Sequence, residues 1–220
     1  MIIKDILARC DHTLLSPSAT LRDVLRVCDE AYEFNTASVC IPPSFVSAAY
    51  GYAGDRVNIC TVIGFPNGYN DTKVKVYETE KAIADGAKEI DAVINVGMLK
   101  EGNTAYVKKE LSEIRKACGG MILKIIVETC LLTDSEKIIM CDIVTETGAD
   151  YIKTSTGFSK AGATEADVVL FAKHIGKNVK IKAAGGIRTF AAAEKFIELG
   201  CSRIGASALV PLAKELKNQL

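Results

Sequence analysis

The sequence is short of histidine and lacks the residue spacings typical of metal and dinucleotide sites. It has 2 histidines, His12 and His174, which lie far apart, and neither stands in a metal-ligand spacing. The Gly-x-Gly-x-x-Gly pattern of dinucleotide-binding folds does not follow the first expected strand. We therefore predict no metal and no cofactor.

An excess of charge and long apolar runs are also missing. Lys+Arg and Asp+Glu balance at 27 each, so no charge excess points to nucleic acid or a membrane surface. No apolar run is long enough to cross a bilayer, and the opening MIIKDILARC is too short and too charged for a signal peptide. We expect a soluble cytoplasmic protein that binds neither nucleic acid nor membranes.

The eight cysteines do not form a disulfide or zinc pattern. No Cys-x-x-Cys pair occurs, and several lie in apolar runs, as small buried side chains do in a reducing compartment. These residues are Cys10, Cys28, Cys40, Cys60, Cys118, Cys130, Cys141 and Cys201.

Short β-rich runs alternate with helical patterns along all 220 residues. This alternation predicts parallel strands joined by right-handed crossovers. Eight such units favour a single (β/α)8 (TIM) barrel over residues 1–220, with an extra N-terminal helix over residues 1–9; an open doubly wound sheet is the alternative. The expected strands start near Asp11 and span residues 37–41, 58–65, 89–95, 122–128, 151–156, 180–186 and 203–207. Helices are expected over residues 71–84, 103–118 and 134–147, with Asp134 and Thr164 as N-caps and Gly86, Gly148 and Gly200 as stops.

Charged side chains occupy positions that should point into this barrel. Side chains alternate along a strand, and the outward positions carry residues such as Ile90, Ala92 and Ile152. Burying a charge costs several kcal/mol unless it is paired, so the set is either a structural ion-pair network or a functional site at the strand ends. The inward charged residues are Asp11, Asp91, Lys124, Glu128, Lys153, Lys180 and Lys182.

Two of these lysines, Lys153 and Lys182, should lie at similar depth on neighbouring strands. An amine that is partly desolvated and beside another cation loses its proton more easily. A neutral amine is what imine formation with a carbonyl requires. The pair therefore points to Lys153 as a nucleophile.

Glycine-rich turns follow the last two strands, at AAGGIRT and IGASAL, and STGFS after the sixth strand adds Gly157. Glycine lets backbone N–H groups approach an anion, and helix N-termini attract negative charge. The loops after strands seven and eight are the usual phosphate site of barrel enzymes. The pattern predicts a phosphorylated small-molecule substrate.

With these motifs in this order, the chain resembles deoxyribose-phosphate aldolase, a class I aldolase family. EIDAVINVG, KTSTGF and KAAGGIRT carry the resemblance, and DHTLL, SVCIPP, GFPNG and KIIVET extend it over nearly the whole chain. It implies reversible, metal-free cleavage of 2-deoxy-D-ribose 5-phosphate to glyceraldehyde 3-phosphate and acetaldehyde. We also expect a homodimer.

The resemblance also implies roles for individual residues. Lys153 would form the Schiff base, while Asp91 and Lys182 would handle protons. The residues that resemble the family's substrate-binding set are Cys40, Lys124, Gly157, Gly185, Gly186, Gly205 and Ser207.

Three positions depart from the family pattern. Phe158 replaces the lysine of some members, and Tyr69 and Asp71 stand where smaller or neutral residues are common. Arg188 is not a departure, but it could supply the charge that Phe158 lacks, or lie outside the pocket. Three other functions stay open from the residues alone: another Schiff-base aldolase or a transaldolase, a phosphate-binding barrel without catalysis, and a metal-dependent aldolase, against which the shortage of histidine speaks.

Overall fold

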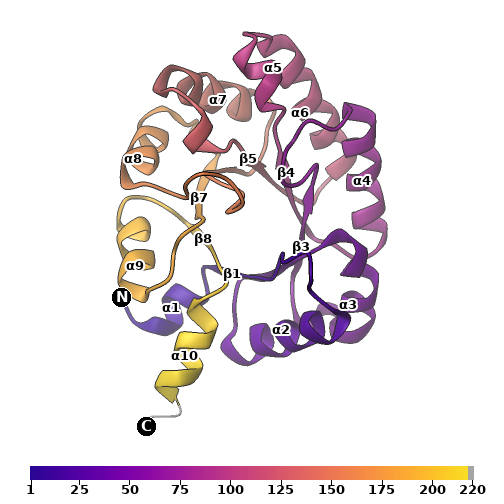
Figure 1. Cartoon of the computed structure of the whole chain (residues 1–220), viewed down its shortest axis with the longest axis vertical. Coiled ribbons are helices and arrows are strands. Elements are labelled where there is room, and N and C mark those ends of the chain that lie inside the picture. The colour runs from indigo at the N-terminus through magenta and orange to yellow at the C-terminus, as the bar shows by residue number, and fades with distance from the viewer. Residues whose placement is uncertain (218–220) are drawn as a thin grey trace.

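The computed structural model describes residues 1–217 and shows a closed barrel of eight parallel strands in the order β1 to β8 (Figure 1). The barrel prediction is therefore confirmed. The strands are β1 (Cys10–Thr13), β2 (Ser38–Ile41), β3 (Ile59–Ile63), β4 (Glu89–Val93), β5 (Ile122–Ile126), β6 (Tyr151–Lys153), β7 (Lys180–Ala184) and β8 (Arg203–Ala206).

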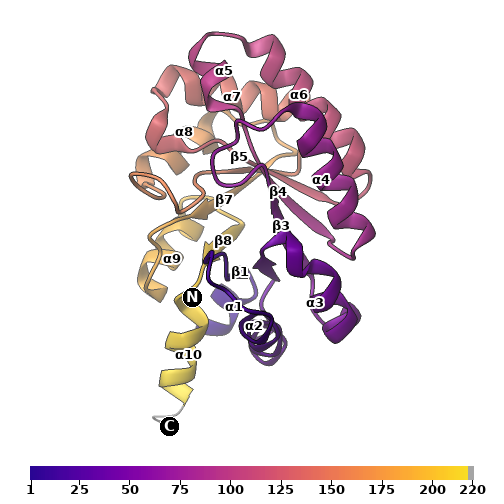
Figure 2. The same cartoon turned by 45° about the vertical axis from the view of Figure 1, so that its right-hand side comes forward.

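The helices surround the strands as an outer ring, and α10 extends away from it in both views (Figures 1 and 2). They are α1 (Ile3–Leu7), α2 (Leu21–Phe34), α3 (Val46–Ala53), α4 (Thr72–Ala84), α5 (Val96–Lys100), α6 (Thr104–Cys118), α7 (Asp134–Glu146), α8 (Glu165–His174), α9 (Phe190–Glu198) and α10 (Leu209–Lys217). Three short 3-10 turns occur at η1 (Pro43–Phe45), η2 (Gly54–Arg56) and η3 (Thr129–Leu131). Among the helices of residues 1–217, none is both long and apolar enough to cross a membrane.

The expected N-terminal helix is present as α1, which packs against α9 and α10 just before β1 begins. Its buried residues, Ile6 and Leu7, join the main hydrophobic core. That core lies mainly between the strands and the helices, because the outward side chains of the strands are apolar. All eight cysteines are free thiols, and seven of them are buried.

The strands end earlier than the sequence predicted. Strands β4 to β8 each stop one to three residues short of the predicted ends, which leaves polar and glycine residues to form loops. At β5 the cause is visible, since Glu128 has a left-handed backbone (φ 58°) that breaks the strand. Lys180, also predicted to point inward, lies on the same face of β7 as Lys182 but at the exposed start of the strand, where its Nζ lies 5.7 Å from the centre of the Tyr151 ring.

Side-chain caps fix the helix starts close to the predicted positions. Thr164 caps α8 as predicted, accepting a hydrogen bond from the backbone N–H of Asp167. For α7 the predicted cap, Asp134, is wrong by one residue: Thr133 is the N-cap, in a capping box with Glu136. This start brings Lys137 within 2.7 Å of Asp167, which ties α7 to α8.

A buried ion pair joins two helices to the barrel strand β4. Lys75 on α4 and Glu110 on α6 have fully buried side chains, with Nζ and Oε2 2.9 Å apart. Lys75 Nζ also donates to the carbonyl of Val93 (2.9 Å), and Glu110 accepts from the backbone N–H of Asn95 (3.3 Å). The pair therefore fixes the carboxyl end of β4.

We predict that Lys75→Met lowers the free energy of unfolding by about 3–5 kcal/mol, because it leaves the Glu110 carboxylate buried without its counter-charge. The measurement is urea unfolding at pH 7. Glu110→Leu in the same chain should recover part of the loss, since no charge is then left alone. A double variant less stable than Lys75→Met would contradict this account.

Candidate active site

A cavity of about 550 Å³ opens at the carboxyl ends of the strands. Its walls come from the segments after β1, β6, β7 and β8, which converge there because parallel strands end on one side of a barrel. Six of the predicted catalytic and substrate-binding residues line it: Lys153, Gly157, Gly185, Gly186, Gly205 and Ser207.

Lys153 is the last residue of β6 and borders the cavity while its residue surface is only 3% exposed. Its Nζ lies 2.8 Å from Oδ2 of Asp91. In the strand register Lys153 stands directly beside Lys182 on β7. The two predicted lysines are therefore neighbours, and both contact one carboxylate.

Asp91, on β4, is fully buried and bonded by three ammonium groups. Lys124 Nζ lies 2.7 Å from Oδ1, while Lys153 and Lys182 lie 2.8 Å and 2.6 Å from Oδ2. Burial by itself would raise the pKa of Asp91, but the positive charges of Lys124, Lys153 and Lys182 outweigh it and hold the pKa well below its usual range. Asp91 is therefore an ionised carboxylate at the centre of a cationic group.

Lys182 is bonded to two carboxylates, those of Asp11 and Asp91. Burial by itself would lower the pKa of Lys182, but the charges of Asp11 and Asp91 outweigh it and raise the pKa above its usual range. Lys182 therefore remains a cation beside Lys153. Gly205 leaves room for it, since a Cβ at this position would lie 3.1 Å from Cε of Lys182.

A lower layer of the cluster contains two residues that the sequence interpretation missed, Glu89 and Arg203. Glu89 accepts from Lys124 (2.6 Å), and Arg203 bonds both Glu89 (3.1 Å) and Asp11 (2.5 Å). Strand alternation could have revealed both, since Glu89 shares a face with Asp91 and Arg203 shares one with Gly205.

This cluster contains three carboxylates and four cationic side chains: Asp11, Glu89 and Asp91 with Lys124, Lys153, Lys182 and Arg203. The positive charges thus exceed the negative ones by one. Lys153 has one carboxylate within 4 Å, whereas each of the other three cations has at least two. Glu128, which was predicted to belong to this group, instead bonds Thr156.

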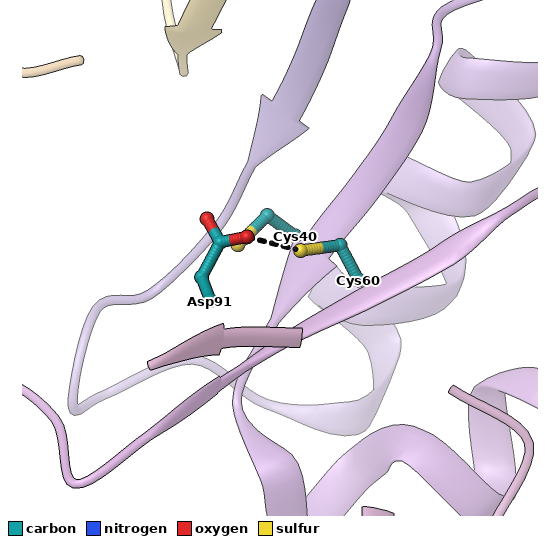
Figure 3. A group of neighbouring side chains, drawn as sticks. All are labelled: Cys40, Cys60 and Asp91. Carbon is teal, nitrogen blue, oxygen red and sulfur yellow. Dashed lines mark hydrogen bonds between the residues drawn. The ribbon is translucent and has the colours of Figure 1, made fainter. Parts of the chain in front are cut away.

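Cys40 and Lys124 are fully buried and are not among the residues lining the cavity. Lys124 lies in the cluster, and Cys40 packs with Cys60 and Val62. Cys60 donates a hydrogen bond of 3.2 Å to Asp91, and Figure 3 shows the three side chains together. The contact of Cys40 and Lys124 with substrate stays a prediction.

Cys40, Cys60 and Asp91 could each offer a ligand atom to a metal ion, since these atoms lie within 4.8 Å of one another. However, the Asp91 oxygens are already bonded by three ammonium groups, which would repel a divalent cation. Burial also raises the pKa of the Cys60 thiol, which opposes formation of the thiolate that a metal needs. The chemistry of this donor set does not fit a metal site.

The glycine-rich part of the cavity is formed by the segments after β6, β7 and β8. Gly185 has φ +87°, and a Cβ there would lie 2.9 Å from Cα of Gly162, so the two loops approach too closely for a side chain. Helix α9 begins just beyond this turn, with Thr189 as its N-cap. Gly157, Gly186 and Ser207 complete this wall, which offers backbone N–H groups and a helix N-terminus to an anion.

The positions that depart from the family pattern have different surroundings. Phe158 lines the cavity and stacks edge-on with Phe65, with 5.2 Å between the ring centres. Arg188 also lines the cavity. Asp71 is the N-cap of α4, and Tyr69 is exposed and accepts a hydrogen bond from Asn67, so neither borders the cavity.

A (β/α)8 barrel with a lysine and a glycine-rich wall in one cavity is the architecture of a barrel enzyme. Comparisons with known proteins identify its family. The model of the DeoC/LacD family of aldolases matches residues 6–207. The chain is 54% identical to a deoxyribose-phosphate aldolase of Clostridium botulinum (strain Eklund 17B / Type B), over 98% of this chain and 97% of that protein. The chain belongs to the DeoC/LacD family of aldolases.

Solved structures agree with this assignment. The structure of an aldolase named QR15 matches with a TM-score of 0.93 and 37% identity, over 98% of this chain and 97% of that one. A deoxyribose phosphate aldolase from Aeropyrum pernix, described as tetrameric, matches with a TM-score of 0.91 and 31% identity, over 100% of this chain and 94% of that one.

We predict that Asp91→Asn lowers the free energy of unfolding by about 3–5 kcal/mol at pH 7, because three buried ammonium groups lose a shared counter-charge. The folded-state pKa of Asp91 is depressed, so its stabilisation is complete above the unfolded value of about 3.9 and is lost as the pH falls through the folded value. The difference between the two proteins should therefore shrink below about pH 4.

Urea unfolding between pH 7 and pH 3 measures this difference. Asp85→Asn is the control, because Asp85 forms an exposed pair with Lys81 on α4 and should change stability by less than about 1 kcal/mol. A difference for Asp91→Asn that is the same at every pH would contradict the electrostatic explanation.

Proposed function

We propose that this aldolase reversibly cleaves 2-deoxy-D-ribose 5-phosphate to D-glyceraldehyde 3-phosphate and acetaldehyde through a Schiff base on Lys153. The observation that carries the proposal is the position of Lys153: it is the one amine of the charged cluster that borders the cavity, which the glycine-rich wall also lines. The names of the relatives support the choice of substrate.

In the first stage the neutral amine of Lys153 attacks C1 of the open-chain aldehyde. Loss of water from the carbinolamine gives an iminium ion, which withdraws electrons from the neighbouring carbons. Lys182, which stays charged, stands directly beside Lys153 in the strand register.

In the second stage the C2–C3 bond breaks. A base, Asp91 acting through a water molecule, takes the proton of the C3 hydroxyl, C3 becomes the aldehyde of glyceraldehyde 3-phosphate, and the bonding electrons move to the iminium nitrogen. Lys153 becomes a neutral enamine as Asp91 gains a proton. Both charges of the Lys153–Asp91 pair are thus neutralised in one step, which compensates for the low basicity of Asp91.

In the last stage the enamine carbon, C2 of the substrate, is reprotonated, and water hydrolyses the iminium to free acetaldehyde and Lys153. Lys182, which bonds the same Asp91 oxygen as Lys153, joins the proton relay. General acid–base help of this kind contributes about 10²–10⁴-fold. The phosphate lies against Gly157, Gly185, Gly186, Gly205 and Ser207, with Cys40 and Lys124 supporting the pocket from below.

Two broader expectations belong to the same proposal: a cytoplasmic location and a homodimer. Light scattering of the purified protein measures the dimer's mass directly, and a tetramer, the assembly described for the Aeropyrum pernix relative, would refute it.

The Schiff base is tested by trapping. Borohydride with acetaldehyde should leave a stable adduct on Lys153, read by peptide mass mapping, since reduction fixes the imine. Lys160→Arg, at an exposed position beyond the same strand, should label normally, whereas Lys153→Arg should not label. An adduct on Lys182 or Lys124 would overturn the assignment.

The phosphate site is tested with Ser207→Asp. A carboxylate at this place should repel the phosphate and raise KM for the phosphorylated sugar by about tenfold or more, the effect of about 1.4 kcal/mol of repulsion. Addition of acetaldehyde to itself involves no phosphate and should be affected less. An equal loss on both reactions would mean that the phosphate binds elsewhere.

A further inference from the structure

One buried carboxylate near the site, Glu128, has no part in the mechanism above. It follows β5, is 3% exposed, and lies outside the charged cluster. Its backbone is left-handed (φ 58°), which is uncommon for a residue with a Cβ. An uncommon backbone conformation beside a cavity raises the question of which groups it positions.

The bonds of Glu128 go to the loop that follows Lys153. Thr156 donates its backbone N–H to both carboxylate oxygens (3.3 Å each) and its hydroxyl to Oε2. The same hydroxyl accepts from the backbone N–H of Phe158 (3.0 Å). A chain of hydrogen bonds therefore runs from Phe158 through Thr156 to Glu128 and spans Gly157.

The residues on either side of Glu128 hold the start of the same loop. Val127 N–H donates to the carbonyl of Lys153 (3.1 Å), and Thr129 N–H donates to the carbonyl of Thr154 (2.9 Å). The left-handed turn at Glu128 lies between these two donors. Three consecutive residues, 127–129, thus hold residues 153, 154 and 156 in place.

The loop held in this way forms a wall of the substrate cavity. Thr156, Gly157 and Phe158 all line it, together with Lys153. Glu128 lines a second, small cavity of about 100 Å³ that shares Thr156 and Phe158 with the substrate cavity, and Glu128 itself is absent from the lining of the substrate cavity. Glu128 therefore supports the wall from behind.

We propose that Glu128 is a positioning residue that fixes residues 154–158 so that the backbone at Gly157 meets the substrate phosphate. The proposal rests on the proposed function. It concerns placement of the wall, so it requires the hydrogen-bond acceptor at this position and does not require the negative charge.

Two variants of Glu128 separate these requirements. Alanine removes the acceptor, whereas glutamine keeps a side-chain oxygen for Thr156 without the charge. Glu, Gln and Ala all carry a Cβ, so the left-handed backbone is equally unusual in each of them. Cys130→Ala is the control, since its thiol lies 3.9 Å from the same carboxylate but makes no bond to Thr156.

The readout is the ratio of kcat/KM for 2-deoxyribose 5-phosphate to kcat/KM for 2-deoxyribose. We expect Glu128→Ala to lower this ratio by about tenfold or more, because small misplacements of a binding group cost up to about 10²-fold. Glu128→Gln and Cys130→Ala should stay within about threefold of wild type, since the acceptor is kept. If Glu128 mattered only for stability, its replacement would lower kcat/KM for both substrates by the same factor and leave the ratio unchanged.

Thr156→Val tests the same link from the other side, and it decides the question if Glu128→Ala does not fold. It removes the hydroxyl between Glu128 and Phe158 at nearly the same volume, so it should lower the ratio in the same direction. The double variant Glu128→Ala/Thr156→Val should add little, because both changes break one chain of bonds.

Two results would overturn the proposal: an unchanged ratio in both Glu128→Ala and Thr156→Val, or a loss in Glu128→Gln as large as in Glu128→Ala, which would indicate a role for the charge. Trapping of acetaldehyde on Lys153 involves no phosphate and should persist in Glu128→Ala. Its absence from wild type would refute the proposed function itself, so the two failures are distinguishable.

Discussion

The site depends on the Asp91 carboxylate, which accepts bonds from Lys124, Lys153 and Lys182 in a fully buried position. Three ammonium groups cannot share a barrel interior without a counter-charge, since each would cost several kcal/mol to bury alone. The carboxylate makes their proximity possible. The same carboxylate holds Lys153 at the edge of the cavity, so one interaction serves both the fold and the proposed chemistry.

The charged side chains in the barrel interior form two layers. Arg203, Glu89 and Asp11 pair below and leave no charge without a partner in their layer. Above them Lys153 has one carboxylate partner and faces the cavity. The sequence presented an ion-pair network and a functional site as alternatives, but the network is present and the proposed site adjoins it at Lys153.

Much of the site could be predicted from alternation and turn chemistry. The alternation of side chains along each strand predicted that Lys153, Lys182 and Asp91 point inward, and the glycine-rich turns predicted the cavity wall. Glu128 could not be placed in this way, because its left-handed backbone ends the alternation one residue earlier. The exposure of Lys180 could not be predicted either, since alternation gives the face of a strand and not the point where the strand emerges into solvent.

The sequence by itself determined the order of strands and helices, the barrel class and the side chains that face inward, because these follow from local periodicity and short-range turns. Only the tertiary structure decided which charges pair. Asp91 and Lys182 are 91 residues apart and Lys182 and Asp11 171 apart, so their contacts depend on barrel closure and strand register. The energies of these pairs depend on the distances between buried charges, which no local sequence pattern encodes.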